Sequence, residues 1–153
     1  MGKLHFGYKR HTITDENGLV LAEETTAANE SDMKHLETPL TKAKLPRKAL
    51  VHADKGYDSM ENKETLKCMK LKSRIMHKGT RGHEITERLQ RINVAISKTH
   101  YKVERTFGSM HRRLGARIAR YVGLSKTHAQ HIMESIAYNL YRTPGIIVSN
   151  CIR

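Results

Sequence analysis

Two carboxylates are candidates for chemistry because of the elements that surround them, and Asp54 is the first. It follows residues 49–53, a short apolar run between Pro46 and Gly56 that is typical of a buried strand. In layered α/β proteins the carboxyl ends of strands open onto a crevice where ligands bind, so Asp54 is a candidate catalytic or ligating group. An Asp in this place is equally often a turn or capping residue, and the pattern alone leaves both interpretations open.

Glu104 is the second candidate, and its setting is a helix. An apolar stripe at helical spacing runs along residues 103–118, and Glu104 lies beside it on a face shared with Gly108 and Gly115. Each glycine weakens a helix by about 1 kcal/mol relative to Ala, and the close approach of another backbone or of a nucleic-acid strand would explain them. The alternative is that Glu104 pairs with a nearby Lys or Arg on a solvated face.

Two further patterns point to structure rather than to chemistry. His128 and His131 have the His-x-x-His spacing of some metal sites, but the sequence offers no third ligand nearby. We interpret them as part of a solvated or DNA-facing surface. Tyr138 and Tyr141 follow the apolar spacing of the last helix and are predicted to pack in the core rather than to stack on bases.

Charge gives the clearest indication of a partner. The chain has 153 residues with a formal net charge of +13, and the excess lies in its second part. Lys and Arg number 10 against 11 Asp and Glu in residues 1–66, 8 against 2 in residues 67–97, and 10 against 2 in residues 98–153. Clustered cations bind phosphates through counterion release, so nucleic acid is the expected partner. A basic ribosomal or solubility-driven surface is the alternative.

Composition excludes several other classes of protein. No apolar run approaches the roughly 20 residues of a membrane span, and the N-terminus has no apolar segment typical of a secretion signal. The two cysteines, Cys68 and Cys151, are too far apart for a disulfide framework or a zinc knuckle. We therefore expect no membrane partner and a location in the reducing cytoplasm.

The first half of the chain is predicted to alternate strands and helices. β-forming residues flank the turn-forming residues 15–18, and Asp58 with Glu61 has capping-box spacing at the start of a helix. The expected elements are a hairpin of residues 6–14 and 19–22, a helix over about 33–43, the strand 49–53, a helix over about 59–70, a strand 73–77 and a basic loop 78–83.

The second half is predicted to be helical. Three apolar stripes at helical spacing cover residues 85–96, 103–118 and 132–140, and Gly123 separates the last two. The order is then ββαβαβ followed by three helices, which favours one α/β or α+β domain.

Five blocks of sequence, in this order along the chain, resemble those of the DDE transposases of bacterial insertion sequences. The nearest group is the insertion-sequence five type, within the insertion-sequence four-like clan. The resemblance covers nearly the whole chain. The blocks are residues 6–9, 25–32, 53–58, 103–108 and 137–140.

The resemblance implies a ribonuclease H-like core, a mixed sheet with helices, followed by C-terminal helices. Three carboxylates of that core bind two Mg²⁺ or Mn²⁺ ions, which suits oxygen ligands and phosphodiester cleavage. Asp54 matches the second carboxylate and Glu104 the third, and both are implied to be catalytic and metal-binding. The first belongs to a strand that should precede residues 6–9, so we expect this chain to be catalytically impaired on its own.

The resemblance also implies an organisation and a set of partners. Residues 1–153 would be part of the catalytic domain, with a hairpin and strand/helix part (1–77) and a helical part that carries the Glu (84–143). The expected partner is double-stranded DNA at insertion-element ends and targets, bound as a dimer or synaptic complex with full-length copies. The implied DNA-binding residues are Lys55, Lys102, Arg105, His111, Arg112 and Arg113.

The sequence departs from the family pattern beside the Glu. The family often places Arg four residues before it and Lys seven after it, where this chain has His100 and His111. A neutral-pH histidine is only partly charged, and Arg112 and Arg113 are the alternative phosphate contacts. Besides an active transposase, two hypotheses stay open. One is a catalytically inactive, DNA-binding remnant that interferes with full-length transposase; the other is a basic RNA-associated protein, for which the usual sequence signatures are absent.

Overall fold

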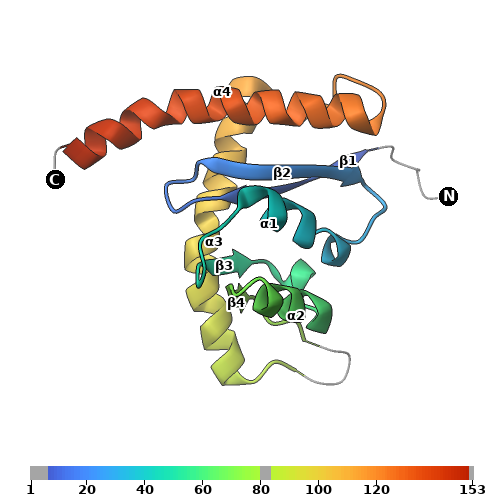
Figure 1. The fold of residues 1–153 in the computed structure, drawn as a ribbon, viewed down its shortest axis with the longest axis vertical. Helices are drawn as coiled ribbons and strands as arrows, with labels where there is room; N and C mark the ends of the chain where they lie inside the picture. Colours follow the sequence, from blue (N-terminus) through green and yellow to red (C-terminus); the bar gives the residue numbers. More distant parts are fainter. Residues whose placement is uncertain (1–6, 80–83, 152–153) are drawn as a thin grey trace. The chain divides into compact units, whose positions relative to one another are not determined.

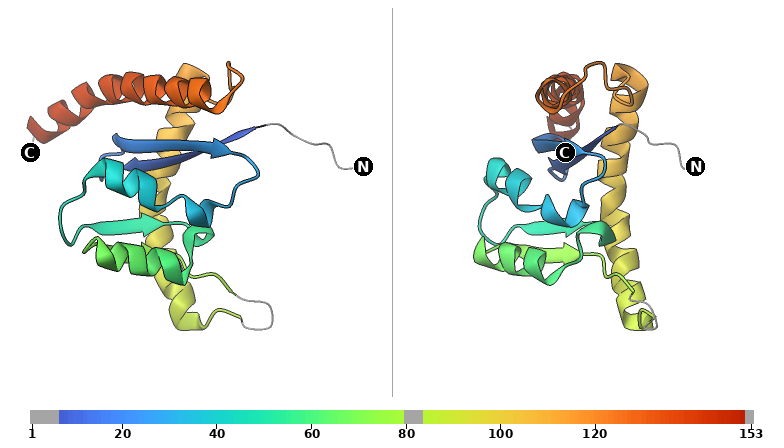
Figure 2. Two further views of the ribbon diagram at one scale, coloured as in Figure 1. Left: turned by 45° about the vertical axis from the view of Figure 1, so that its right-hand side comes forward. Right: turned by 90° about the vertical axis from the view of Figure 1, so that its right-hand side faces the viewer.

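The computed structural model describes residues 7–79 and 84–151, and these form two compact units. Unit 1 combines the chain up to Glu30 with the chain from Val103 onward, and unit 2 comprises Ser31–Lys102. Helix α3 (Glu87–Leu114) contributes its first part to unit 2 and its last part to unit 1. The two units are shown in Figures 1 and 2.

Unit 1 is built on a β-hairpin. Strands β1 (Tyr8–Thr14) and β2 (Val20–Ala27) pair antiparallel, which confirms the predicted hairpin and extends its second strand. Asp15 closes the turn, since its Oδ1 accepts hydrogen bonds from the backbone N–H groups of Asn17 and Leu19 at 2.9 and 2.8 Å. Helix α4 (Leu124–Cys151) lies along the hairpin and packs on β2, as Figures 1 and 2 show.

Unit 2 contains a parallel strand pair with its crossover helix. Strand β3 (Leu50–Ala53) pairs with β4 (Lys72–Ile75), and α2 (Met60–Cys68) connects them, as expected of a βαβ unit. The core includes Leu40, Leu66 and Ile75, each at most 3% exposed. Two short 3₁₀ helices, η1 (Asp32–Lys34) and η2 (Lys55–Tyr57), contact each other, and α1 (Glu37–Ala43) follows η1.

The fold class is confirmed as mixed α/β with long C-terminal helices, but the sheet differs from the prediction. Instead of one mixed sheet, the described residues form two separate two-stranded sheets, β1–β2 in unit 1 and β3–β4 in unit 2. Each pair is local, a hairpin or a βαβ unit, and in the part of the chain described no strand joins them.

Several helix predictions need correction. The helix expected over 33–43 is divided into η1 and α1, and the stripes of residues 85–96 and 103–118 belong to one helix, α3, which ends at Leu114. No Gly or Pro lies between residues 84 and 107 to separate them. Three predicted C-terminal helices are therefore two. Ile118 is 67% exposed in the linker before α4, and the basic loop 78–83 lies partly outside the described residues.

Candidate functional site

Asp54 lies at the carboxyl end of β3, as predicted, and its side chain is exposed. Its Oδ1 accepts a hydrogen bond from the backbone N–H of Lys55 at 2.7 Å and so caps η2. Behind this turn, Asn62 donates its side-chain amide to the Tyr57 carbonyl oxygen at 2.9 Å. The turn-capping interpretation is therefore confirmed, and Asp54 is also an exposed carboxylate at a strand end, so its catalytic or ligating role stays a prediction.

Asp58 does not begin α2, contrary to the capping-box prediction. Ser59 is the N-cap, since its Oγ accepts from the Asn62 backbone N–H at 3.1 Å. Asp58 instead forms an ion pair with Lys63 at 2.6 Å and accepts from the Lys78 backbone N–H at 2.8 Å. Burial raises the pKa of Asp58, but these two hydrogen bonds outweigh it and hold that pKa below its ordinary value. Asp58 is thus a structural carboxylate that ties the end of β4 to the turn.

Glu104 projects from α3 in unit 1 and is exposed. The rotation of the helix is fixed by Thr106, which is fully buried and donates to the Gly18 carbonyl oxygen at 2.9 Å. Gly115 has a φ of +65° just past the end of α3, so it is explained as a helix cap and not by a close approach of another chain. At Gly108 an added Cβ would meet only the Arg112 guanidinium, at 4.0 Å, so this face of the helix is open.

The two carboxylates offer ligand chemistry that suits a hard divalent cation. Carboxylate oxygens are the ligands that hard divalent cations prefer, and both side chains are exposed. Asp54 belongs to unit 2 and Glu104 to unit 1. Over residues 7–79 and 84–151, no group of three or more His, Cys, Asp or Glu side chains is arranged to hold a metal ion.

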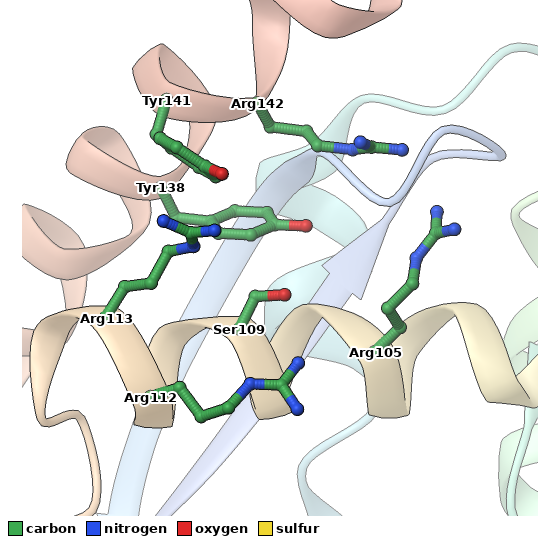
Figure 3. A pocket seen from close by; sticks show the side chains of 7 residues that line it. All are labelled: Arg105, Ser109, Arg112, Arg113, Tyr138, Tyr141 and Arg142. Atoms are coloured by element: carbon green, nitrogen blue, oxygen red, sulfur yellow. The ribbon is translucent and has the colours of Figure 1, made fainter.

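Unit 1 contains a cavity between α3 and α4, which we call the arginine cavity. Its volume is about 320 Å³. Residues spaced i, i+4, i+7 and i+8 on one face of α3 form one wall, and residues i, i+3 and i+4 of α4 form the other (Figure 3). The lining residues are Arg105, Ser109, Arg112 and Arg113 from α3, and Tyr138, Tyr141 and Arg142 from α4.

The arginine cavity is strongly cationic and has no acidic residue in its lining. Arg112, Arg113 and Arg142 form no ion pair with a carboxylate anywhere in the described chain. The Arg113 guanidinium lies 4.2 Å from the centroid of the Tyr141 ring, a cation–π contact that Figure 3 shows. Like charges held together without counterions favour an anionic ligand.

Three of the four arginines that line this cavity were singled out from the sequence. Arg105, Arg112 and Arg113 were expected to bind DNA, and the helical spacing brings them together. Arg142 and Tyr141 were missed as site residues, although Arg142 follows Tyr138 by one helical turn. Tyr138 is 3% exposed and packs in the core as predicted, whereas Tyr141 is 54% exposed, so its predicted core position is wrong.

The other predicted DNA-binding residues lie elsewhere. Lys55 is exposed beside Asp54 in unit 2, and Lys102 is half-buried at the end of the same unit. His52 lies in β3, two residues before Asp54. Its pKa is lowered mainly by burial and then by the positive charges of Arg74 and Lys102. His111 is half-buried on α3, and its pKa is lowered by burial and by Arg117 and Arg10, which leaves it little charge at neutral pH.

A buried charge network holds α4 against the hairpin and so positions the second wall of the cavity. The Arg10 side chain, 10% exposed, pairs with Glu23 and with Glu134, the latter at 3.0 Å. It also donates to the Ser135 hydroxyl at 2.6 Å and to the His131 carbonyl oxygen at 2.9 Å. Two of these α4 partners, Glu134 and Ser135, lie within about one helical turn of Tyr138, which lines the cavity.

Asn139 supplies a second attachment of α4 to the hairpin. Its side-chain oxygen accepts from the Val20 backbone N–H at 2.9 Å, and its amide donates to the Val20 carbonyl oxygen at 2.8 Å. The side chain thereby makes the two hydrogen bonds that a neighbouring strand would make. Asn139 therefore has a structural role in the block of residues 137–140.

The His-x-x-His pair is structural, and its predicted solvated surface is wrong for His131, which is 8% exposed. The Thr25 side-chain oxygen lies 2.8 Å from His131 Nδ1 and 3.1 Å from His128 Nδ1. Burial, then Arg10, lowers the pKa of His131, against the opposing effect of Glu23 and Glu134. Folding therefore disfavours the charged form of the His131 imidazole.

Because the pKa of His131 is lowered by folding, we predict that the protein loses stability in acid. Below its ordinary pKa of 6.5 the unfolded state binds a proton that the folded state resists, so acid favours unfolding. The free energy of unfolding should fall as the pH drops below about 6.5, by at most about 1.4 kcal/mol per pH unit for each histidine. Urea unfolding followed by circular dichroism between pH 5 and 8 would measure it (roughly the range in which histidine titrates). His131→Gln should have a shallower pH dependence; a dependence equal to that of the wild type would contradict this assignment.

Comparisons with known proteins agree on one family. Residues 1–140 match the family model described as the transposase DDE domain. The chain is 41% identical over 141 residues to the transposase for insertion sequence element IS1106 of Neisseria meningitidis serogroup B, across 92% of this chain and 48% of that protein. It is 34% identical over 128 residues to a protein of Burkholderia cepacia assigned as a transposase for insertion sequence element IS402, across 74% of this chain and 54% of that protein.

Two further observations bear on these comparisons. The chain spans about half the length of the two curated relatives it matches. No solved structure gives a significant match.

Among the helices of the described residues, none is long and apolar enough to span a membrane.

Proposed function

Because the chain belongs to the transposase DDE domain family, we propose that it acts in DNA transposition as part of the domain that cuts and joins DNA at the ends of an insertion element. The family match over residues 1–140 carries this proposal. The arginine cavity in unit 1 supports it, because it presents an anion-binding surface on the helix that also carries Glu104. Within this family we propose the insertion-sequence five type as its group.

The proposed catalytic residues are Asp54 and Glu104, as two of the three carboxylates of a ribonuclease H-like core. The family implies divalent metal use, and two Mg²⁺ or Mn²⁺ ions would activate the attacking oxygen and stabilise the leaving one. This chain's own contribution is to hold carboxylate oxygens in exposed positions, Asp54 by capping η2 and Glu104 by the fixed rotation of α3.

The proposed DNA-binding residues differ in their charge, exposure and location. Arg105, Arg112 and Arg113 line one cationic cavity, whose guanidinium groups suit phosphate oxygens. Lys55 stands beside Asp54, where it would meet a phosphate near the catalytic carboxylate. Lys102 and His111 are half-buried, and the lowered pKa of His111 makes it a hydrogen-bonding rather than a charged contact.

The second candidate function is a catalytically inactive DNA-binding remnant that interferes with full-length transposase. One observation favours it: the arginine cavity is complete within unit 1, and its lining includes neither Asp54 nor Glu104. In either case the proposed partner is double-stranded DNA, approached as a dimer or synaptic complex in the bacterial cytoplasm.

The salt dependence of DNA binding tests the proposal. The affinity of the purified chain for labelled duplex DNA with phosphorylated ends should fall steeply with salt, with a log-log slope near −0.9 for each phosphate neutralised. Arg112→Gln and Arg113→Gln should each reduce the magnitude of this slope by about one. Arg91→Gln, an exposed arginine of α3 in unit 2, is the matched control. A flat salt dependence in the wild-type protein would rule out the proposed DNA contacts.

A further inference from the structure

We propose that the arginine cavity binds the terminal phosphate monoester of a nucleic-acid strand, and that the nucleoside next to this phosphate contacts Tyr141. This inference rests on the proposed function, because hydrolysis of a phosphodiester adds water across one P–O bond. One product strand then ends in a hydroxyl group and the other in a phosphate monoester. The cavity would hold the second product end.

The charge of the cavity suits a phosphate monoester. Four guanidinium groups surround a volume of about 320 Å³, and three of them, on Arg112, Arg113 and Arg142, have no carboxylate partner in the described residues. A phosphate monoester carries about −1.5 to −2 charges at pH 7 and three acceptor oxygens, whereas a phosphodiester within a strand carries one charge. Several uncompensated guanidinium groups around one small volume therefore match a strand end better than an internal phosphate.

The shape of the cavity also favours a strand end. Phosphates of a duplex are spread along its outer surface, and a protein that follows them needs cations distributed in the same way. Here the guanidinium groups come from two facing helices and line a single cavity (Figure 3). Such an arrangement surrounds one phosphate group, and Arg binds phosphate oxygens through paired N–H donors.

Tyr141 gives the site a place for the nucleoside. Its ring is 54% exposed, carries the Arg113 guanidinium at 4.2 Å from its centroid, and lies beside Arg142. Aromatic rings with an adjacent Arg are typical platforms for unstacked bases. A base inside a duplex is covered by its neighbours, so only the nucleoside at an end can reach the ring.

The test measures the affinity of the 153-residue chain for short labelled duplexes that are identical except for their ends. One duplex has a 5′-phosphate, one a 3′-phosphate and one only hydroxyl groups. The wild-type protein should bind one phosphorylated duplex about tenfold more tightly than the hydroxyl duplex. The phosphorylated duplex that binds more tightly identifies whether the cavity accepts a 5′-phosphate or a 3′-phosphate.

Substitutions inside and outside the cavity test whether the cavity causes this preference for a phosphorylated end. Arg142→Gln and Arg112→Gln should bring the affinity ratio close to one, and Tyr141→Ala should reduce it. Arg91→Gln, outside the cavity, should keep the ratio of the wild type. Arg112 is exposed, so its substitution leaves the core intact, and circular dichroism checks the fold of the half-buried Arg142 variant.

Two outcomes would overturn the inference, and they differ from failure of the proposed function. Equal affinity of the wild-type protein for all three duplexes would show that DNA is bound without recognition of an end. Variants that weaken every duplex by the same factor would show that the arginines contact internal phosphates. In both cases DNA binding persists, whereas absence of any DNA binding would overturn the proposed function as well.

Discussion

Replacing Arg10 by Ala should destabilise unit 1 by about 3–5 kcal/mol, which is the usual cost of removing one partner from a buried charge pair. Glu23 and Glu134 are 1% and 9% exposed, and without the guanidinium two carboxylates would remain buried next to each other. Domains of this size are stable by only about 5–15 kcal/mol, so the variant should lose a large share of its stability. Urea unfolding followed by circular dichroism gives the change directly.

A matched control separates burial from charge. Arg91 also pairs with a glutamate, Glu87, at 3.8 Å, but both side chains are more than 80% exposed. Arg91→Ala should therefore change the free energy of unfolding by less than about 0.5 kcal/mol. Adding Glu23→Gln and Glu134→Gln to Arg10→Ala should recover part of the lost stability, because the buried charges are removed. Equal effects of Arg10→Ala and Arg91→Ala would refute a structural role for the network.

Local elements of this fold were predictable because short-range chemistry specifies them. The hairpin turn follows from Asp15 and Gly18, and the strand before Asp54 follows from an apolar run with turn residues on both sides. The position of Asp54 at a strand end was therefore predicted correctly. The interpretation of Gly115 was wrong, because the sequence does not distinguish a glycine on a helix face from one that ends the helix with a positive φ.

Long-range contacts were not predictable in the same way. Nothing in the sequence near Arg10 indicates that its charge is neutralised by Glu134, 124 residues away, and that this pair fixes α4 on the hairpin. The buried His131 was misread for the same reason, since its partner Thr25 lies 106 residues away in sequence. Periodicity places a side chain on a face of a helix, but the partner of that face decides between core and solvent.

The arginine cavity depends both on local sequence spacing and on long-range contacts. The spacing of Arg105, Arg112 and Arg113 on α3 is visible in the sequence, and charge patterning indicated an anionic partner. Arg142 joins them only because the Arg10 network and Asn139 fix α4 on the hairpin. One wall of the site was thus predictable from local spacing, and the other depends on tertiary contacts.

Asp54→Asn and Glu104→Gln should each remove the same metal-binding site, if these residues act together as proposed. Bound Fe²⁺ can replace Mg²⁺ as a probe, because with ascorbate and peroxide it generates hydroxyl radicals that cut the backbone nearby. In the wild-type chain the cuts should cluster around both residue 54 and residue 104. Each substitution should reduce the cuts at both positions by at least about tenfold, since a shared site loses affinity when either ligand is lost.

The pattern of cuts distinguishes a shared site from separate ones without relying on catalytic activity. Glu61→Gln is the matched control, because Glu61 is an exposed carboxylate of α2, seven residues after Asp54. It should leave both sets of cuts unchanged. Cuts around only one of the two residues, or cuts at residue 54 that persist in Glu104→Gln, would mean that the two carboxylates do not share an ion. The arginine cavity would then be the functional part of this chain, and the DNA-binding remnant the better description of it.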